Sequence, residues 1–235
     1  MKNILTSLCL FIIAFQFSTY SQNKNIKDDW PNLNKYAEAD SILGLPSPGE
    51  KRIVFMGNSI TESWVKIDSS FFANPEYIGR GISGQTSSQM LLRFHQDVIN
   101  LKPNVVVILA GTNDIAENAG PIALKDILGN IISMSQIAEY NNIKVILCSV
   151  PPAYDFSWHH GLQPAEKIVK LNSMIKSYCS ENNIAYVNFY SKLVDDRMGF
   201  DKRYSKDGVH PNLAGYQIMD SLIVKEMNHT INSAK

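Results

Sequence analysis

The sequence has little cysteine, no excess of charge of either sign and no apolar run long enough to cross a bilayer. Its 22 basic and 22 acidic side chains cancel, and neither kind forms a long run. A surface that follows phosphate backbones is therefore not indicated, and we expect no nucleic-acid partner. The 235 residues are 45% hydrophobic, which suffices for one full core and makes a single domain the simplest expectation.

The chain begins with Lys2, an apolar stretch from Ile4 to Phe17, and then small and polar residues. This is the pattern of a secretory signal, and Thr19 and Ser21 are suitably placed for cleavage. This stretch of 14 residues falls short of the roughly 20 that span a bilayer, so we favour a cleaved signal at residues 1–21 over a membrane anchor. We therefore expect a secreted or periplasmic protein with no stable membrane insertion after signal removal.

Two cysteines, Cys148 and Cys179, remain after signal removal. An even pair in an oxidising compartment permits a disulfide. However, Cys148 lies in an apolar strand pattern and Cys179 late in a helical pattern, so two separate buried thiols are an equally good expectation. Neither cysteine has a partner at the spacing of a metal site, and we predict no metal and no cofactor.

Short apolar runs alternate with longer amphipathic stretches from residue 51 onward, after a polar lead segment at residues 22–50. The predicted strands are residues 52–56, 76–80, 105–110, 144–150 and 185–189, and the predicted helices are residues 86–98, 121–141, 163–182 and 212–228. The third and fourth runs have almost no polar alternation, which is typical of parallel strands covered on both faces. The pattern predicts an α/β fold with an open parallel sheet between two layers of helices.

Ligands bind at the carboxyl ends of the strands in such a sheet. Ser59 follows the first predicted strand, Gly84 the second and Asn113 the third. We therefore expect these three residues to meet at one edge of the sheet, although they are far apart in the sequence.

Ser59 and Gly84 lie in the first two of four segments that could carry chemistry. In GNSIT, a serine between a buried strand and a helix that begins near Ile60 exposes its Oγ among the free N–H groups of the helix start. Helix capping alone would also explain a serine there. In GRGISGQTSSQ, Gly81 and Gly84 allow a ligand to approach a backbone N–H closely, but the loop matches neither common phosphate-binding pattern.

Asn113 lies in the third segment, and Asp207 and His210 lie in the fourth. VVVILAGTNDIAEN delivers Asn113 to the ligand edge, where its carboxamide can donate to a developing oxyanion. A turn in which Asn and Asp bond their own backbone is the alternative. In SKDGVHPNLAGY, the close spacing lets Asp207 hold Nδ1–H of His210, which leaves Nε2 to act as a general base toward Ser59.

Together these segments resemble the SGNH, or GDSL-type, hydrolase family, whose pattern is a serine block, a glycine block, an asparagine block and a terminal Asp-x-x-His block in that order. The resemblance covers residues from about 51 to 225 and places a hydrolase domain at residues 51–235. It implies a three-layer α/β/α fold with a flavodoxin-like five-stranded parallel sheet. It also implies a carboxylic ester hydrolase that needs no metal.

The resemblance further implies a Ser-His-Asp triad and an oxyanion hole, made up of Ser59 as nucleophile, His210 as general base, Asp207 as its orienting acid, and donors from Ser59, Gly84 and Asn113. One position departs from the family pattern, because Asn58 stands where the family usually has Asp. Asn keeps the capacity to form a turn but removes a charge beside the nucleophile. An electrostatic contribution from that position is therefore in doubt.

Three other classes of protein fit the sequence less well. An α/β-hydrolase needs G-x-S-x-G around its nucleophile, and Thr61 occupies the last position here. A flavodoxin-like cofactor binder needs a Ser/Thr-rich phosphate turn, which GNSITESW does not provide. A noncatalytic saccharide-binding module would have no reason to retain Ser59, Asp207 and His210 together.

The substrate is indicated by the loop PPAYDFSWHHGLQP, which brings aromatic and imidazole rings toward the ligand edge. Our candidates for substrate contact are Asn58, Tyr154, Trp158 and His159. Aromatic faces suit sugar rings or a short acyl pocket, although packing beneath the loop is an equal alternative. We expect a small ester substrate, plausibly an acetylated saccharide, as in the carbohydrate-esterase and platelet-activating-factor-acetylhydrolase-like branches. Lysophospholipase or thioesterase activity stays open, and the sequence predicts no oligomeric state.

Overall fold

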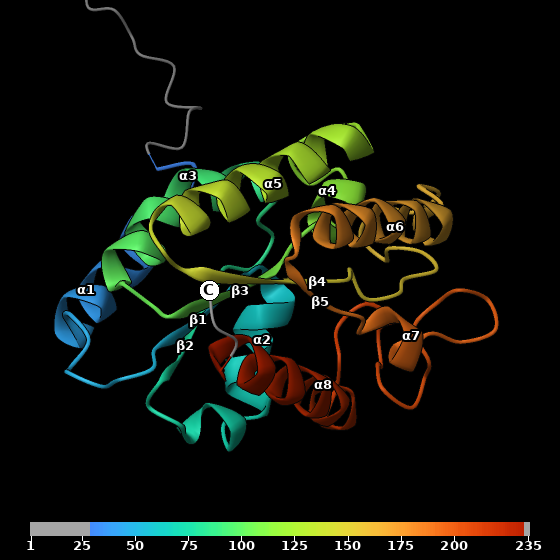
Figure 1. Cartoon of the computed structure of the whole chain (residues 1–235). Coiled ribbons are helices and arrows are strands. Elements are labelled where there is room, and N and C mark those ends of the chain that lie inside the picture. The colour runs from blue at the N-terminus through green and yellow to red at the C-terminus, as the bar shows by residue number, and fades with distance from the viewer. Residues whose placement is uncertain (1–28, 233–235) are drawn as a thin grey trace, which may run out of the picture.

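Five short apolar runs form one parallel sheet in the computed structural model, which describes residues 29–232 (Figure 1). The strands are β1 (Ile53–Gly57), β2 (Tyr77–Gly81), β3 (Val105–Leu109), β4 (Lys144–Cys148) and β5 (Ala185–Val187). Their order across the sheet is β2-β1-β3-β4-β5, and every neighbouring pair is parallel. The predicted flavodoxin-like sheet is confirmed.

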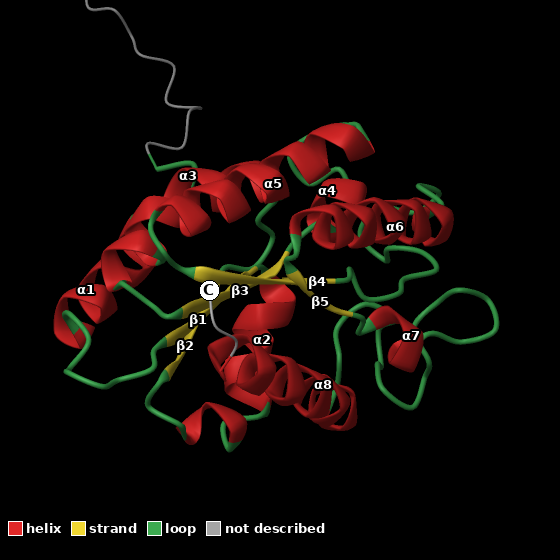
Figure 2. Ribbon diagram, in the orientation of Figure 1, coloured by secondary structure: helices red, strands yellow, loops and turns green. Residues whose placement is uncertain are grey.

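Helices cover both faces of the sheet, as Figure 2 shows. One layer contains α1 (Asn34–Leu43), α3 (Ser87–Asp97), α4 (Thr112–Ile115), α5 (Leu124–Tyr140) and α6 (Pro164–Asn182), and the other contains α2 (Ser59–Ile67), α7 (Tyr190–Leu193) and α8 (Leu213–Asn232). Short 3₁₀ turns lie at Phe71–Ala73 and Ile99–Leu101. Successive residues of β1 point to opposite layers, so Val54 joins the core beneath α3 and α5, whereas Phe55 joins the core beneath α2 and α8. Because both of their faces are buried, β1 and β3 contain only apolar residues and glycine.

Two local features differ from the sequence prediction. The helix expected from residue 121 begins at Leu124, because Pro121 lies in the preceding loop. The lead segment, to which the sequence assigned no helix, contains α1, which has no buried residue and therefore no clear apolar stripe. Its polar side chains hold it against β2: the Tyr36 hydroxyl donates to the Gly81 carbonyl, and Asp40 pairs with Arg80.

The two described cysteines are free and buried. Cys148 lies in the core cluster beneath α2 and α8, whereas Cys179 lies in the cluster on the other face of the sheet. Burial raises the pKa of Cys179 to about 12, so its thiol stays protonated and unreactive at neutral pH. The structure therefore has two separate buried thiols and no disulfide between Cys148 and Cys179.

Strand register aligns the carboxyl ends of the three strands that lead to the predicted site. Gly57, the last residue of β1, pairs with Gly81 of β2 on one side and with Leu109 of β3 on the other. Ser59 follows Gly57 by two positions and therefore emerges between the loops that leave the two neighbouring strands.

The predicted signal at residues 1–21 lies outside the described residues. Within residues 29–232, no helix is both long and apolar enough to cross a membrane.

Candidate active site

A serine, a histidine and an aspartate form a continuous hydrogen-bonded chain at the carboxyl edge of the sheet. The Ser59 Oγ lies 2.9 Å from Nε2 of His210, and the other ring nitrogen of His210 lies 2.7 Å from Oδ2 of Asp207. Ser59 is the first residue of α2, and His210 lies three residues before α8. In this arrangement the imidazole can take the proton of the hydroxyl while the carboxylate holds the ring.

The loop before α8 fixes the carboxylate of Asp207. Its Oδ1 accepts hydrogen bonds from the N–H groups of Val209 and His210, at 2.9 and 2.8 Å, and from the Ser205 hydroxyl at 3.1 Å. Partial burial works to raise the pKa of Asp207, but these backbone bonds and the His210 ring outweigh it and lower the pKa to about 2. The carboxylate therefore stays charged throughout the neutral range.

Contacts between α2 and α8 set the distance between the serine and the histidine. The Tyr216 hydroxyl of α8 donates to the Ile60 carbonyl of α2 at 2.8 Å, and Nε1 of Trp64 donates to Asp220 at 2.8 Å. The rings of Trp64 and Tyr216 are stacked, with centroids 5.7 Å apart. The two helices that flank the reacting groups therefore pack as one layer.

The three predicted oxyanion donors come from separate segments of the chain. Because Ser59 begins α2, its N–H has no acceptor within that helix. Gly84 lies in the exposed β2–α3 loop at φ +79°, a conformation that favours glycine. Asn113 lies in α4 and is 3% exposed, and its Nδ2 donates to the Gln85 carbonyl at 2.9 Å. That bond uses one N–H of the carboxamide.

Two polar residues of the predicted segments, Asn58 and Asp114, are buried and make hydrogen bonds within the fold. Asn58, a predicted substrate contact, is 1% exposed, and its Oδ1 accepts from the Ile60 N–H as the cap of α2. Asp114 is buried, and its carboxylate accepts from the N–H and the hydroxyl of Ser87. It therefore joins α4 to the start of α3.

One aromatic residue of the β4–α6 loop lies beside the histidine. The Trp158 ring centroid is 6.4 Å from that of His210, and the Trp158 side chain is partly exposed. Its Nε1 donates to Oδ1 of Asn118 at 3.0 Å, and Nδ2 of Asn118 donates to the Gly84 carbonyl at 3.3 Å. Asn118 therefore connects the β4–α6 loop, which contains Trp158, to the β2–α3 loop, which contains Gly84. Asn118 is not among the residues singled out from the sequence, although it lies in the same segment as Asn113, five positions later.

The other side chains of the β4–α6 loop have contacts of their own. Nδ1 of His159 lies 2.9 Å from the Ala116 carbonyl, and His160 pairs with Asp155. Tyr154 packs under the guanidinium of Arg197. In the described part of the chain, no group of His, Cys, Asp and Glu side chains is arranged to hold a metal ion.

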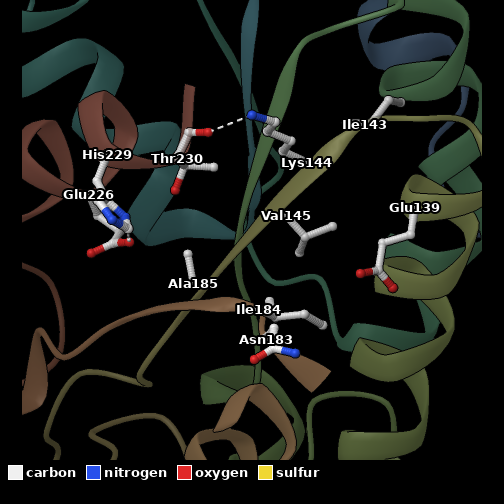
Figure 3. Close-up of a pocket in the computed structure, with 10 residues that line it drawn as sticks. All are labelled: Glu139, Ile143, Lys144, Val145, Asn183, Ile184, Ala185, Glu226, His229 and Thr230. Carbon is white, nitrogen blue, oxygen red and sulfur yellow. Dashed lines mark hydrogen bonds and ion pairs between the residues drawn. The ribbon is translucent and has the colours of Figure 1, made fainter. Parts of the chain in front are cut away.

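A pocket of about 580 Å³ lies at the opposite edge of the sheet, at the amino ends of β4 and β5 (Figure 3). Within it, the Lys144 ammonium donates to the carbonyls of Thr230 and Ile231 at 2.8 and 3.3 Å. Those carbonyls belong to the last turn of α8, so the lysine caps a helix end. None of the triad residues lines this pocket.

The chain is similar to known proteins along most of its length. The family model of the GDSL-like lipase/acylhydrolase family matches residues 55–218. A GDSL-like lipase from Bacteroides thetaiotaomicron has 49% sequence identity and a TM-score of 0.83, over 85% of this chain and 98% of that one. A Bacteroides fragilis protein has 48% identity and a TM-score of 0.86, over 88% and 100%.

A curated relative is more distant in sequence. Esterase TesA of Pseudomonas aeruginosa is 27% identical over 188 residues, which cover 77% of this chain and 85% of the relative. The family model covers well over half of the chain, and the solved structures share its fold along most of their length. The chain therefore belongs to the GDSL-like lipase/acylhydrolase family and is a carboxylic ester hydrolase.

Proposed function

We propose that this protein is a secreted serine esterase that hydrolyses short-chain acyl esters, with acetyl groups on saccharides as the favoured substrate class. The carrying observation is the Ser59 Oγ at 2.9 Å from Nε2 of His210, whose Nδ1 lies 2.7 Å from the charged carboxylate of Asp207. A hydroxyl, an imidazole and a carboxylate in this order are the parts of a nucleophilic triad.

The reaction proceeds in two acyl transfers. The Ser59 Oγ attacks the ester carbonyl while Nε2 of His210 takes its proton, and the resulting oxyanion accepts hydrogen bonds from the N–H groups of Ser59 and Gly84 and from Asn113. His210 then protonates the leaving alcohol. A water molecule, deprotonated by the same nitrogen, attacks the acyl-serine and releases the acid. Asp207 stabilises the imidazolium that forms in each half.

The position of Trp158 supports a ring-bearing alcohol group. The indole is 46% exposed, and its ring centroid lies 6.4 Å from that of His210, the residue that would protonate the leaving alcohol. Sugar rings stack on such partly exposed aromatic faces. A phospholipid or thioester substrate is the second candidate, because the family is one of lipases and acylhydrolases.

A panel of substrates separates these candidates. The panel contains p-nitrophenyl esters of increasing chain length, acetylated xylo-oligosaccharides, a lysophospholipid and an acyl thioester. The proposal expects the highest kcat/KM on acetyl esters, with saccharides preferred over simple alcohols. A preference for acyl chains of about eight carbons or more would favour the lipid alternative, and binding of saccharides without turnover of any ester would favour the noncatalytic alternative.

Two substitutions test the machinery itself. We expect Ser59→Ala to fold normally and to lose ester cleavage, so retained turnover would refute the nucleophile. We expect Asn113→Ala to lower kcat by about 10²- to 10³-fold if its carboxamide serves the oxyanion. Asn130→Ala is a matched control, because that carboxamide donates to the hydroxyls of Ser87 and Ser88. Equal effects of the two asparagine variants would remove Asn113 from the site.

A further inference from the structure

A buried guanidinium joins two of the segments that form the candidate active site, the end of β1 and the β2–α3 loop. Arg93, in the middle of α3, is 0% exposed. Its Nη2 donates to the Gly57 carbonyl at 2.8 Å, its Nε to the side-chain oxygen of Gln85 at 2.5 Å, and its Nη1 to Asp97 at 2.7 Å. The rigid fork of the guanidinium thus joins β1 and the β2–α3 loop to the helix that carries it.

Each of the first two acceptors leads directly to a proposed oxyanion donor. Gly57 precedes Ser59 by two positions, so the hydrogen bond from Arg93 to the Gly57 carbonyl holds the start of the turn that carries the serine and its N–H. Gln85 follows Gly84 directly, and the Gln85 carbonyl accepts from Nδ2 of Asn113 at 2.9 Å. Movement of Gln85 would therefore shift the Gly84 N–H and the Asn113 carboxamide together.

We propose that Arg93 is a positioning residue that sets the mutual placement of the Ser59, Gly84 and Asn113 donors. The inference rests on the proposed function, because the donors matter only if an oxyanion forms between them. Arg93 does not touch the reacting atoms. It acts through Gly57 and Gln85, so its loss should impair stabilisation of the transition state more than binding of the ester.

The chain offers a matched control for the structural part of this role. Arg52 is equally buried, at 1% exposure, and also has three acceptors: Glu50, the Gly44 carbonyl and the Leu101 carbonyl. It directly precedes β1 and lies at the amino edge of the sheet, away from Ser59. Loss of either arginine removes a buried charge with its hydrogen bonds, but only Arg93 is connected to the donors.

Three variants make the test robust to loss of folding. Arg93→Lys keeps a charge beside Asp97 but cannot span the three acceptors. Arg93→Met combined with Asp97→Asn removes the fork without leaving a buried carboxylate unpaired. Arg52→Met is the control. Each is assayed by steady-state turnover of p-nitrophenyl acetate, at a temperature where circular dichroism and urea unfolding show the variant to be folded.

We expect both Arg93 variants to lower kcat by about 10- to 100-fold with KM within about 3-fold of the wild-type value, because misplacement of a donor by about 1 Å has an effect of this size. We expect Arg52→Met to lower stability and leave kcat unchanged. In an Asn113→Ala background, the Arg93 substitutions should change log kcat by less than about half as much as they do in the wild-type protein, because one of the donors that Arg93 positions is already absent.

The inference is overturned if Arg93→Lys and the double variant retain kcat within about 3-fold of wild type, if Arg52→Met lowers kcat equally, or if the Arg93 and Asn113 effects multiply in full. The proposed function fails by a different result, namely wild-type turnover in Ser59→Ala, whatever the Arg93 variants do.

Discussion

Gly81→Ala tests whether the end of β2 fixes the first turn of the helix that begins with Ser59. A Cβ built on Gly81 would lie 2.2 Å from the Glu62 nitrogen and 2.7 Å from both the Asn58 carbonyl oxygen and the Thr61 carbonyl carbon. All three atoms are backbone atoms, so no side chain can rotate away. Gly81 is in extended β conformation, which alanine adopts freely, so the clash is the whole perturbation.

The size of the effect follows from these distances. Ordinary carbon contacts begin near 3.5 Å, so α2 must move away from β2 by about 1 Å. Overpacking of this kind costs about 1–3 kcal/mol of the free energy of unfolding. The same shift would carry the Ser59 Oγ out of its 2.9 Å contact with His210, and a displacement of this size lowers kcat by about 10²-fold.

Gly129→Ala is the matched control, because a Cβ on this glycine of α5 meets nothing within 4 Å. Alanine is the better helix former, so this variant should gain about 0.5–1 kcal/mol and keep full turnover. Urea unfolding measures the stability of both variants, and turnover of p-nitrophenyl acetate measures their activity. If Gly81→Ala were as stable and as active as wild type, the close contact between β2 and α2 would not position the serine.

Three further predictions address the charge, the substrate and the pH dependence. Asp207→Asn should lower kcat by about 10³- to 10⁴-fold, because the charge facing His210 is lost; a decrease below about 10-fold would contradict the orienting role. Trp158→Ala should raise KM for acetylated xylo-oligosaccharides by about 5-fold and leave kcat/KM for ethyl acetate unchanged, and an equal loss on both esters would exclude the stacking role. Burial, assisted by the nearby Asp68, raises the pKa of Asp220 to about 7 from 3.8, so the stabilisation that its protonated form gives is lost as pH rises through about 7. Asp220→Asn should therefore raise Tm relative to wild type more at pH 8 than at pH 5, and a pH-independent difference would contradict this sign.

The sequence predicted most of the fold because the strands are buried on both faces. Val105–Leu109 is apolar at every position, and such a run has few alternatives to a central parallel strand. The same property made the ligand edge predictable, since a residue directly after a parallel strand lies at the carboxyl edge of the sheet. In contrast, α1 lacks an apolar face and is held by the long-range partners of Tyr36 and Asp40, which no local pattern reveals.

Within the site, contacts could be predicted where the strand ends or a short sequence spacing determine them. Asp207 and His210 are three positions apart, so their contact is readable from the sequence. The contacts of Arg93 with Gly57 and of Trp158 with Asn118 span 36 and 40 positions, and nothing local distinguishes these side chains from ordinary core or loop residues. The sequence predicts a turn-forming capacity and a substrate contact for Asn58; the structure shows a buried cap whose Oδ1 accepts from the Ile60 N–H in the first turn of α2.

The two helix layers hold different parts of the proposed active site. Ser59 and His210 are attached to α2 and α8, which pack on one face of the sheet through Trp64 and Tyr216. The proposed donors lie on the other face, where Gly84 precedes α3 and Asn113 belongs to α4. There Arg93 bonds both Gln85, whose carbonyl accepts from Asn113, and the end of β1. Substitutions between α2 and α8 should therefore change proton transfer between serine and histidine, whereas substitutions beneath α3 should change stabilisation of the oxyanion. Under the proposed mechanism, Ser59 follows β1 and supplies both the attacking hydroxyl and a donor N–H, so both kinds of effect should meet at this serine.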